Sequence, residues 1–107
     1  MLNKPQRIQR KRVKNWRMPT DTIYIGHPGP FGNPYYIDDR CQHLSWFKAD
    51  LVKERNARNG PTSEHRWAIH FWKMARLLPT LRGKNLACWC PLDQPCHGDI
   101  LLEIANQ

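Results

Sequence analysis

Three cysteines and a histidine lie close together near the C-terminal end of this 107-residue chain. They form the pattern Cys88-Trp89-Cys90, then five residues, then Cys96-His97. On a strand, Cys88 and Cys90 would point to one face and Trp89 to the other. Because thiolates and imidazole bind zinc tetrahedrally, Cys88, Cys90, Cys96 and His97 are a candidate zinc site. The spacing is unusual for zinc, and buried free cysteines often serve only as small core residues, so both interpretations stay open.

Cys96 and His97 also support a second interpretation, because they precede a predicted helix over about 98–105. A helix N-terminus attracts anions and lowers the pKa of a thiol. His97 could donate to a phosphate or act as a general acid or base, and Asp99 could orient an imidazole. Cys96, His97 and Asp99 are therefore the candidate catalytic residues, with no cofactor required.

A second polar loop, 26–34, follows an apolar run at 22–25 and contains three glycines and three prolines. Glycines let backbone N–H groups approach an anion, and an asparagine amide can pair with a base edge or a ribose hydroxyl. The spacing matches neither the Walker A loop nor the dinucleotide fingerprint. A rigid turn that needs glycine is the alternative. The candidate ligand-binding residues are Gly26, His27, Gly29, Gly32, Asn33, Cys88, Cys90 and Gly98.

The hydrophobic pattern predicts the elements that would hold these loops. Strands are expected at 22–25 and 85–90, and helices over about 45–59, from Thr62 or Ser63 to about 78, and over about 98–105. Ser45 is a plausible N-cap of the first helix. This order predicts a small, single-domain, Rossmann-like α/β fold of two or three layers with a short, mainly parallel sheet. Parallel neighbouring strands would bring both polar loops to one edge, where such folds bind ligands.

The formal net charge of +8 is concentrated at the N-terminus, where residues 1–17 hold seven basic and no acidic side chains. We therefore expect a basic N-terminal arm over 1–17 and a single α/β domain over 18–107, with 7–17 extended or solvated. Such an arm suits DNA or RNA phosphates and base stacking, and suits an acidic protein or membrane surface equally. The candidate nucleic-acid contacts are Arg7, Arg10, Lys11, Arg12, Lys14, Trp16 and Arg17.

The sequence also excludes some classes of protein. No apolar run approaches the roughly 18 residues of a membrane span, and no apolar stretch follows the basic start, as a secretory signal requires. We expect a cytoplasmic protein without a membrane partner, whose cysteines stay reduced.

Two stretches resemble a known family. They are Tyr24-Ile25-Gly26 with Gly32-Asn33-Pro34, and the segment 81–106 around its C-W-C and C-H-G-D motifs. They are similar to domain of unknown function 4326, a small family that bacteria and bacteriophages carry, over about residues 22–106. His27 stands where the family often has arginine, and Phe31 where it has tryptophan. The resemblance does not identify a catalysed reaction. Because the predicted order of elements is similar to that of small Rossmann-like domains, it implies a nucleotide or nucleic-acid ligand.

Three functions fit these observations. In the first, the rim between loop 26–34 and residues 96–99 binds a nucleotide or nucleic-acid phosphate, and the protein is an enzyme if that rim also processes it. In the second, a zinc ion stabilises the fold of a nucleic-acid-binding module that has no catalytic activity. In the third, the loops shape a phage-type protein-interaction module.

Overall fold

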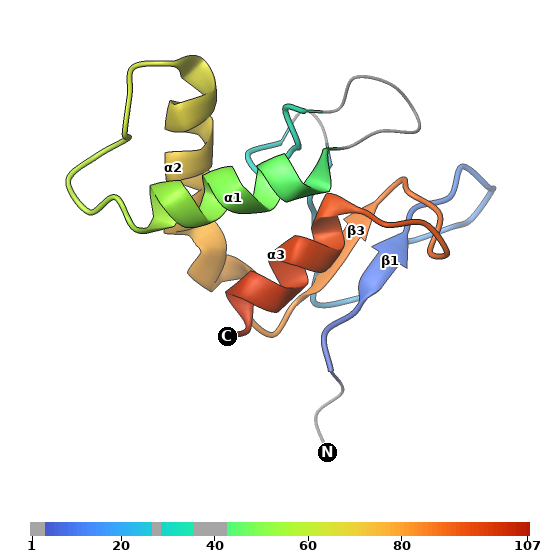
Figure 1. The fold of residues 1–107 in the computed structure, drawn as a ribbon. Coiled ribbons are helices and arrows are strands. Elements are labelled where there is room, and N and C mark those ends of the chain that lie inside the picture. The colour runs from blue at the N-terminus through green and yellow to red at the C-terminus, as the bar shows by residue number, and fades with distance from the viewer. Residues whose placement is uncertain (1–3, 27–28, 36–42) are drawn as a thin grey trace.

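The computed structural model describes residues 4–26, 29–35 and 43–107. Its elements are β1 (Arg7–Gln9), β2 (Thr22–Tyr24), α1 (Leu44–Arg55), α2 (Arg66–Leu81), β3 (Asn85–Cys88) and α3 (His97–Ala105). β3 is the central strand and pairs in parallel with β1 on one side and β2 on the other. The helices pack together on one side of this sheet (Figure 1). The predicted α/β fold with a short parallel sheet is confirmed, and it has two layers.

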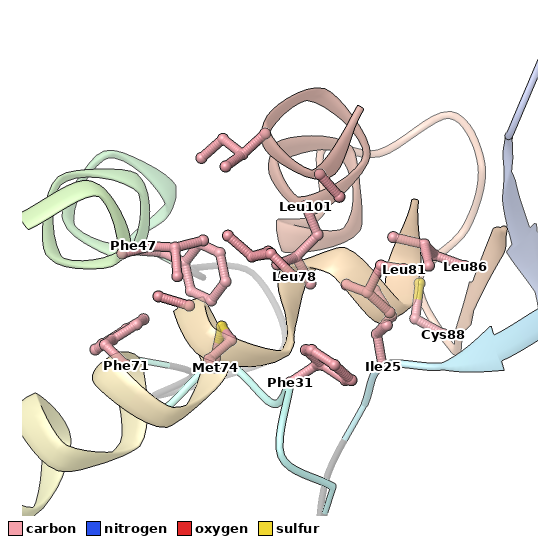
Figure 2. Close-up of a cluster of buried hydrophobic side chains, with 14 of the residues drawn as sticks. Ile25, Phe31, Phe47, Phe71, Met74, Leu78, Leu81, Leu86, Cys88 and Leu101 are labelled. Atoms are coloured by element: carbon pink, nitrogen blue, oxygen red, sulfur yellow. The ribbon is translucent and has the colours of Figure 1, made fainter. Parts of the chain in front are cut away.

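The core lies between the helices and one face of the sheet. Ile25 extends from the end of β2, and Leu86 and Cys88 come from β3. They share a buried cluster with Leu81 of α2 and Leu101 of α3 (Figure 2). This core fastens the carboxyl end of the sheet against the start of α3, where the candidate site residues lie.

β1 lies inside the segment expected to be an arm. It pairs with β3 from Arg7 opposite Leu86 to Gln9 opposite Cys88, and the N–H of Arg10 continues the pairing at 2.8 Å from the Cys88 carbonyl. The hydrophobic pattern did not indicate this strand because Arg7 and Gln9, which β1 turns toward the core side of the sheet, are both polar. Residues 1–17 therefore contain a strand of the sheet as well as exposed basic residues.

The elements begin and end at other residues than predicted. Both predicted strands end sooner, at Tyr24 and Cys88. α1 begins after His43, whose φ of 45° is left-handed, and not at a Ser45 cap. α2 begins after His65, whose Nδ1 caps the helix by accepting from the N–H of Trp67 at 3.1 Å. Thr62 donates instead to the buried carboxylate of Glu54, from its N–H at 2.9 Å and its hydroxyl at 2.6 Å. No helix among the described residues is long and apolar enough to cross a membrane.

Candidate functional site

Cys88, Cys90 and Cys96 form a cluster at the carboxyl end of the sheet. Their Sγ atoms all lie within 4.8 Å of one another, and those of Cys88 and Cys96 are 3.3 Å apart. Alternation along the end of β3 explains why the first two share a side, as predicted. The loop 91–95 then returns the chain so that Cys96 reaches the same place. Thiol sulfurs gathered so closely are soft metal ligands, so this cluster could hold a metal ion.

His97, the predicted fourth ligand, lies outside this cluster. Its Nε2 is 2.8 Å from the Ile25 carbonyl, and because a carbonyl only accepts, Nε2 carries the proton and donates. Its Nδ1 is 3.6 Å from Cys96 Sγ, and its buried ring packs edge-on against Phe47. Adjacent residues at a helix start point in different directions, so Cys96 turns toward the other thiols while His97 fastens α3 to β2. The expected set of four ligands reduces to three thiols.

Cys96 is the N-cap of α3. Its Sγ accepts from the N–H of Gly98 at 3.4 Å, and its own N–H donates to Asp99 Oδ2 at 3.2 Å. The expected lowering of the thiol pKa is wrong. Hydrogen bonds with Cys88 and Cys90, together with burial, raise the pKa of Cys96 and outweigh the N–H of Gly98. A raised pKa keeps the Cys96 thiol protonated and makes it a poor nucleophile.

Arg7 connects the cysteine cluster, the loop 91–95 and α3. Its Nη2 donates to three backbone carbonyls of that loop at 2.7 to 3.2 Å, and its Nε lies 3.1 Å from Asp99 Oδ1. Its Nη1 lies 3.9 Å from Cys88 Sγ. Burial opposes the charge of Arg7, but the cysteines and Asp99 outweigh it and raise its pKa further. Arg7 was predicted to contact nucleic acid, but its side chain is only 6% exposed and is used inside the domain.

The two polar loops lie at the same end of the sheet, because β2 and β3 are parallel neighbours. Gly98 lets α3 approach β2 closely. A Cβ at this position would lie 2.8 Å from Ile25 Cδ1 and 3.1 Å from Arg7 Cδ, so packing alone requires the glycine.

The loop after β2 is built from successive turns. The N–H of Gly29 donates to Gly26 at 3.0 Å and that of Gly32 to Gly29 at 3.2 Å. Asn33 is buried, and its Oδ1 accepts from the N–H of Tyr35 at 2.9 Å. These contacts match the rigid turn that was the alternative interpretation of this loop. His27, a candidate phosphate contact, lies outside the described residues.

The opposite face of the sheet carries two arginines stacked on aromatic rings. The guanidinium of Arg10 lies 4.8 Å from the ring centres of both Tyr24 and Trp89, and that of Arg12 lies 4.8 Å from Trp89. The charge pattern had indicated both arginines but neither ring. Alternation along the strands was the signal that could have found them, since it places both rings opposite the core residues Ile25 and Cys88. The other predicted contacts here are exposed or half-buried: Lys11, Lys14, Trp16 and Arg17.

Among known proteins, one family matches the chain. No curated protein and no solved structure matches the chain. Residues 8–107 match the family described as a domain of unknown function, DUF4326. The match includes β1 except for Arg7, a strand that the resemblance noted from the motifs had not reached. Because it covers nearly the whole chain, the protein belongs to this family, the domain of unknown function DUF4326.

Proposed function

We propose that the protein is a zinc-binding module in which Cys88, Cys90 and Cys96 hold the ion. The observation that carries this proposal is the gathering of the three sulfur atoms. A Zn–S bond of about 2.3 Å places the sulfurs of a tetrahedral site about 3.8 Å apart. All three sulfurs lie within 4.8 Å of one another, and those of Cys88 and Cys96 are 3.3 Å apart, so only small adjustments would admit the ion.

The surroundings of the cluster support a cationic occupant with thiolate ligands. Three thiolates and Zn²⁺ together carry a formal charge of minus one, and the cation Arg7 beside Cys88 offsets it. The N–H of Gly98 points at Cys96 Sγ, as backbone N–H groups that donate to metal-bound sulfur do. Bound zinc would fasten the end of β3 to α3. Its fourth coordination place would remain for water or another donor.

Metal analysis of the purified chain tests the proposal. We expect one zinc per chain in protein prepared without chelator, and a lower melting temperature after the metal is removed, because metal binding stabilises the folded state. Cys88→Ser, Cys90→Ser and Cys96→Ser should each lose zinc. Trp89→Phe is the matched control, since it changes the residue between two ligands and keeps all three thiols. Metal-free protein whose melting temperature does not respond to added zinc would refute the proposal.

Phosphate binding at the rim draws less support. Two N–H groups at the start of α3 are already used, that of Gly98 by Cys96 Sγ and that of Asp99 by the Cys96 carbonyl at 3.0 Å. The Asp99 carboxylate at the same helix end would repel a phosphate. A nucleotide site at this rim therefore stays a prediction, which a thermal-shift screen with nucleotides tests. A protein-interaction role likewise stays a prediction.

A further inference from the structure

We propose that Arg10, Arg12, Tyr24 and Trp89 form a binding surface for single-stranded nucleic acid, named here the stacked basic face. The four side chains lie on the face of the sheet away from the core. Their stacking order is Tyr24, Arg10, Trp89 and Arg12, with each cation 4.8 Å from the ring centres it contacts. The proposal does not rest on zinc, because the thiol cluster lies on the other side of β3.

The two guanidinium groups are held in place while their hydrogen-bond donors remain uncommitted. Among the described residues neither side chain makes a hydrogen bond or ion pair, and the Nε of Arg10 is buried without a partner. Arg76 provides the contrast. It lies 4.7 Å from the ring centre of Trp72, but its nitrogens donate to three backbone carbonyls. Guanidinium groups that aromatic rings already hold in place lose little conformational entropy on binding. Their paired N–H donors suit bidentate hydrogen bonding to a phosphate.

The charge around this face matches a polyanion. No acidic residue occurs between Lys4 and Thr20, and Lys11, Lys14 and Arg17 of the same segment are exposed. The nearest acid along the chain, Asp21, pairs with Lys84 at 3.3 Å. A backbone of phosphates placed here would release counterions from several cations at once.

The aromatic rings favour single-stranded nucleic acid over other polyanions as the ligand. Trp89 is 39% exposed although both guanidinium groups contact its ring, and Arg12 at the end of the stack is exposed. A base can therefore stack on the guanidinium plane of Arg12 beside the ring. Single-stranded bases stack on aromatic rings and on guanidinium planes, whereas a duplex keeps its bases stacked on each other. An acidic protein segment would satisfy the cations but would offer no base to stack on them. A membrane interface also accommodates tryptophan, and the vesicles in the test below separate it from nucleic acid.

Fluorescence polarisation with the full chain tests the proposal. The probes are labelled oligothymidine and oligouridine of about 20 nucleotides, a DNA duplex of equal length, and phosphatidylserine vesicles. We expect both single strands to bind more tightly than the duplex at equal salt, with affinity falling linearly in log–log coordinates as salt rises. The two single strands show whether DNA or RNA is preferred.

Variants of the face separate charge from stacking. Arg12→Gln should weaken single-strand binding about fivefold at 0.1 M salt and reduce the salt slope by about 0.7, the contribution of one phosphate contact. Arg12→Lys should keep the slope and lose part of the affinity. Trp89→Leu should weaken binding about tenfold and Trp89→Phe less, because the ring that holds both guanidinium groups in place is lost or reduced. Arg58→Gln is the matched control, since Arg58 is exposed and belongs to the connection between α1 and α2. That connection lies away from the sheet (Figure 1).

Zinc content and melting temperature, measured on each variant, distinguish loss of this face from loss of the metal or the fold. Arg12 is exposed, so Arg12→Gln tests the proposal even if Trp89→Leu does not fold. Three results would overturn the proposal: duplex bound as tightly as single strands, Arg12→Gln indistinguishable from Arg58→Gln, or binding to vesicles without binding to oligonucleotides.

Discussion

Replacing Arg7 with methionine should destabilise the protein by about 3 kcal/mol. The change keeps a long apolar stem and removes the guanidinium, which donates to three loop carbonyls and pairs with Asp99. A hydrogen bond to a charged group contributes about 1.5–3 kcal/mol, but these carbonyls lie near solvent and part of each bond is replaced by water. The Asp99 side chain is 53% exposed, so the ion pair itself adds about 1 kcal/mol at most.

Urea unfolding of the variant and the wild type measures this loss, and the melting temperature should fall by about 15 °C, at 4–8 °C per kcal/mol for a domain of this size. Arg7→Lys should recover less than half of the lost stability, because a single ammonium group cannot donate to all the loop carbonyls that the forked guanidinium reaches. Arg17→Met is the control, since it removes the same charge from an exposed position of the same segment. A loss below about 1 kcal/mol, or an Arg7→Lys variant as stable as wild type, would refute the argument that Arg7 holds the loop.

Three further predictions follow from other contacts. Burial and the hydrogen bond to Asp50 raise the pKa of Tyr35 from 10.0 to about 12, so its contribution to stability is complete below pH 10 and is lost as the pH rises through about 12. Unfolding measured from pH 9 upward should therefore show a smaller alkaline loss in Tyr35→Phe than in wild type; equal losses would contradict the assignment. Gly98→Ala should cost about 1–3 kcal/mol by overpacking, and Ile25→Val in the same chain should restore part of it by removing the Cδ1 that the new methyl meets. Glu54→Ala should cost about 2 kcal/mol in urea unfolding, because the buried carboxylate that accepts two hydrogen bonds from Thr62 is lost; an unchanged midpoint would show that water replaces the carboxylate.

Most of the fold could be predicted because it follows local rules. Alternation along β3 placed Cys88 and Trp89 on opposite sides, and the order of strands and helices indicated parallel pairing. What could not be predicted depends on contacts between residues far apart in the chain. Arg7 is buried because carbonyls 84 to 87 residues away accept its hydrogen bonds. A single arginine in the sequence does not indicate such distant contacts. The chemistry of its side chain made His97 a predicted ligand and catalytic residue. The orientation of its ring depends on a hydrogen bond to the Ile25 carbonyl, which only the folded protein places beside it.

The place of β3 in the sheet has a consequence for how the protein is made. The strands at the two edges do not pair with each other, and both depend on β3, which begins at Asn85. The ribosome releases β1 and β2 long before it synthesises their common partner. The sheet therefore cannot form until residues 85–88 have left the exit tunnel, and any product that ends before residue 85 lacks it entirely. During that interval the highly basic N-terminal segment emerges beside the ribosomal RNA with no folded domain to hold it.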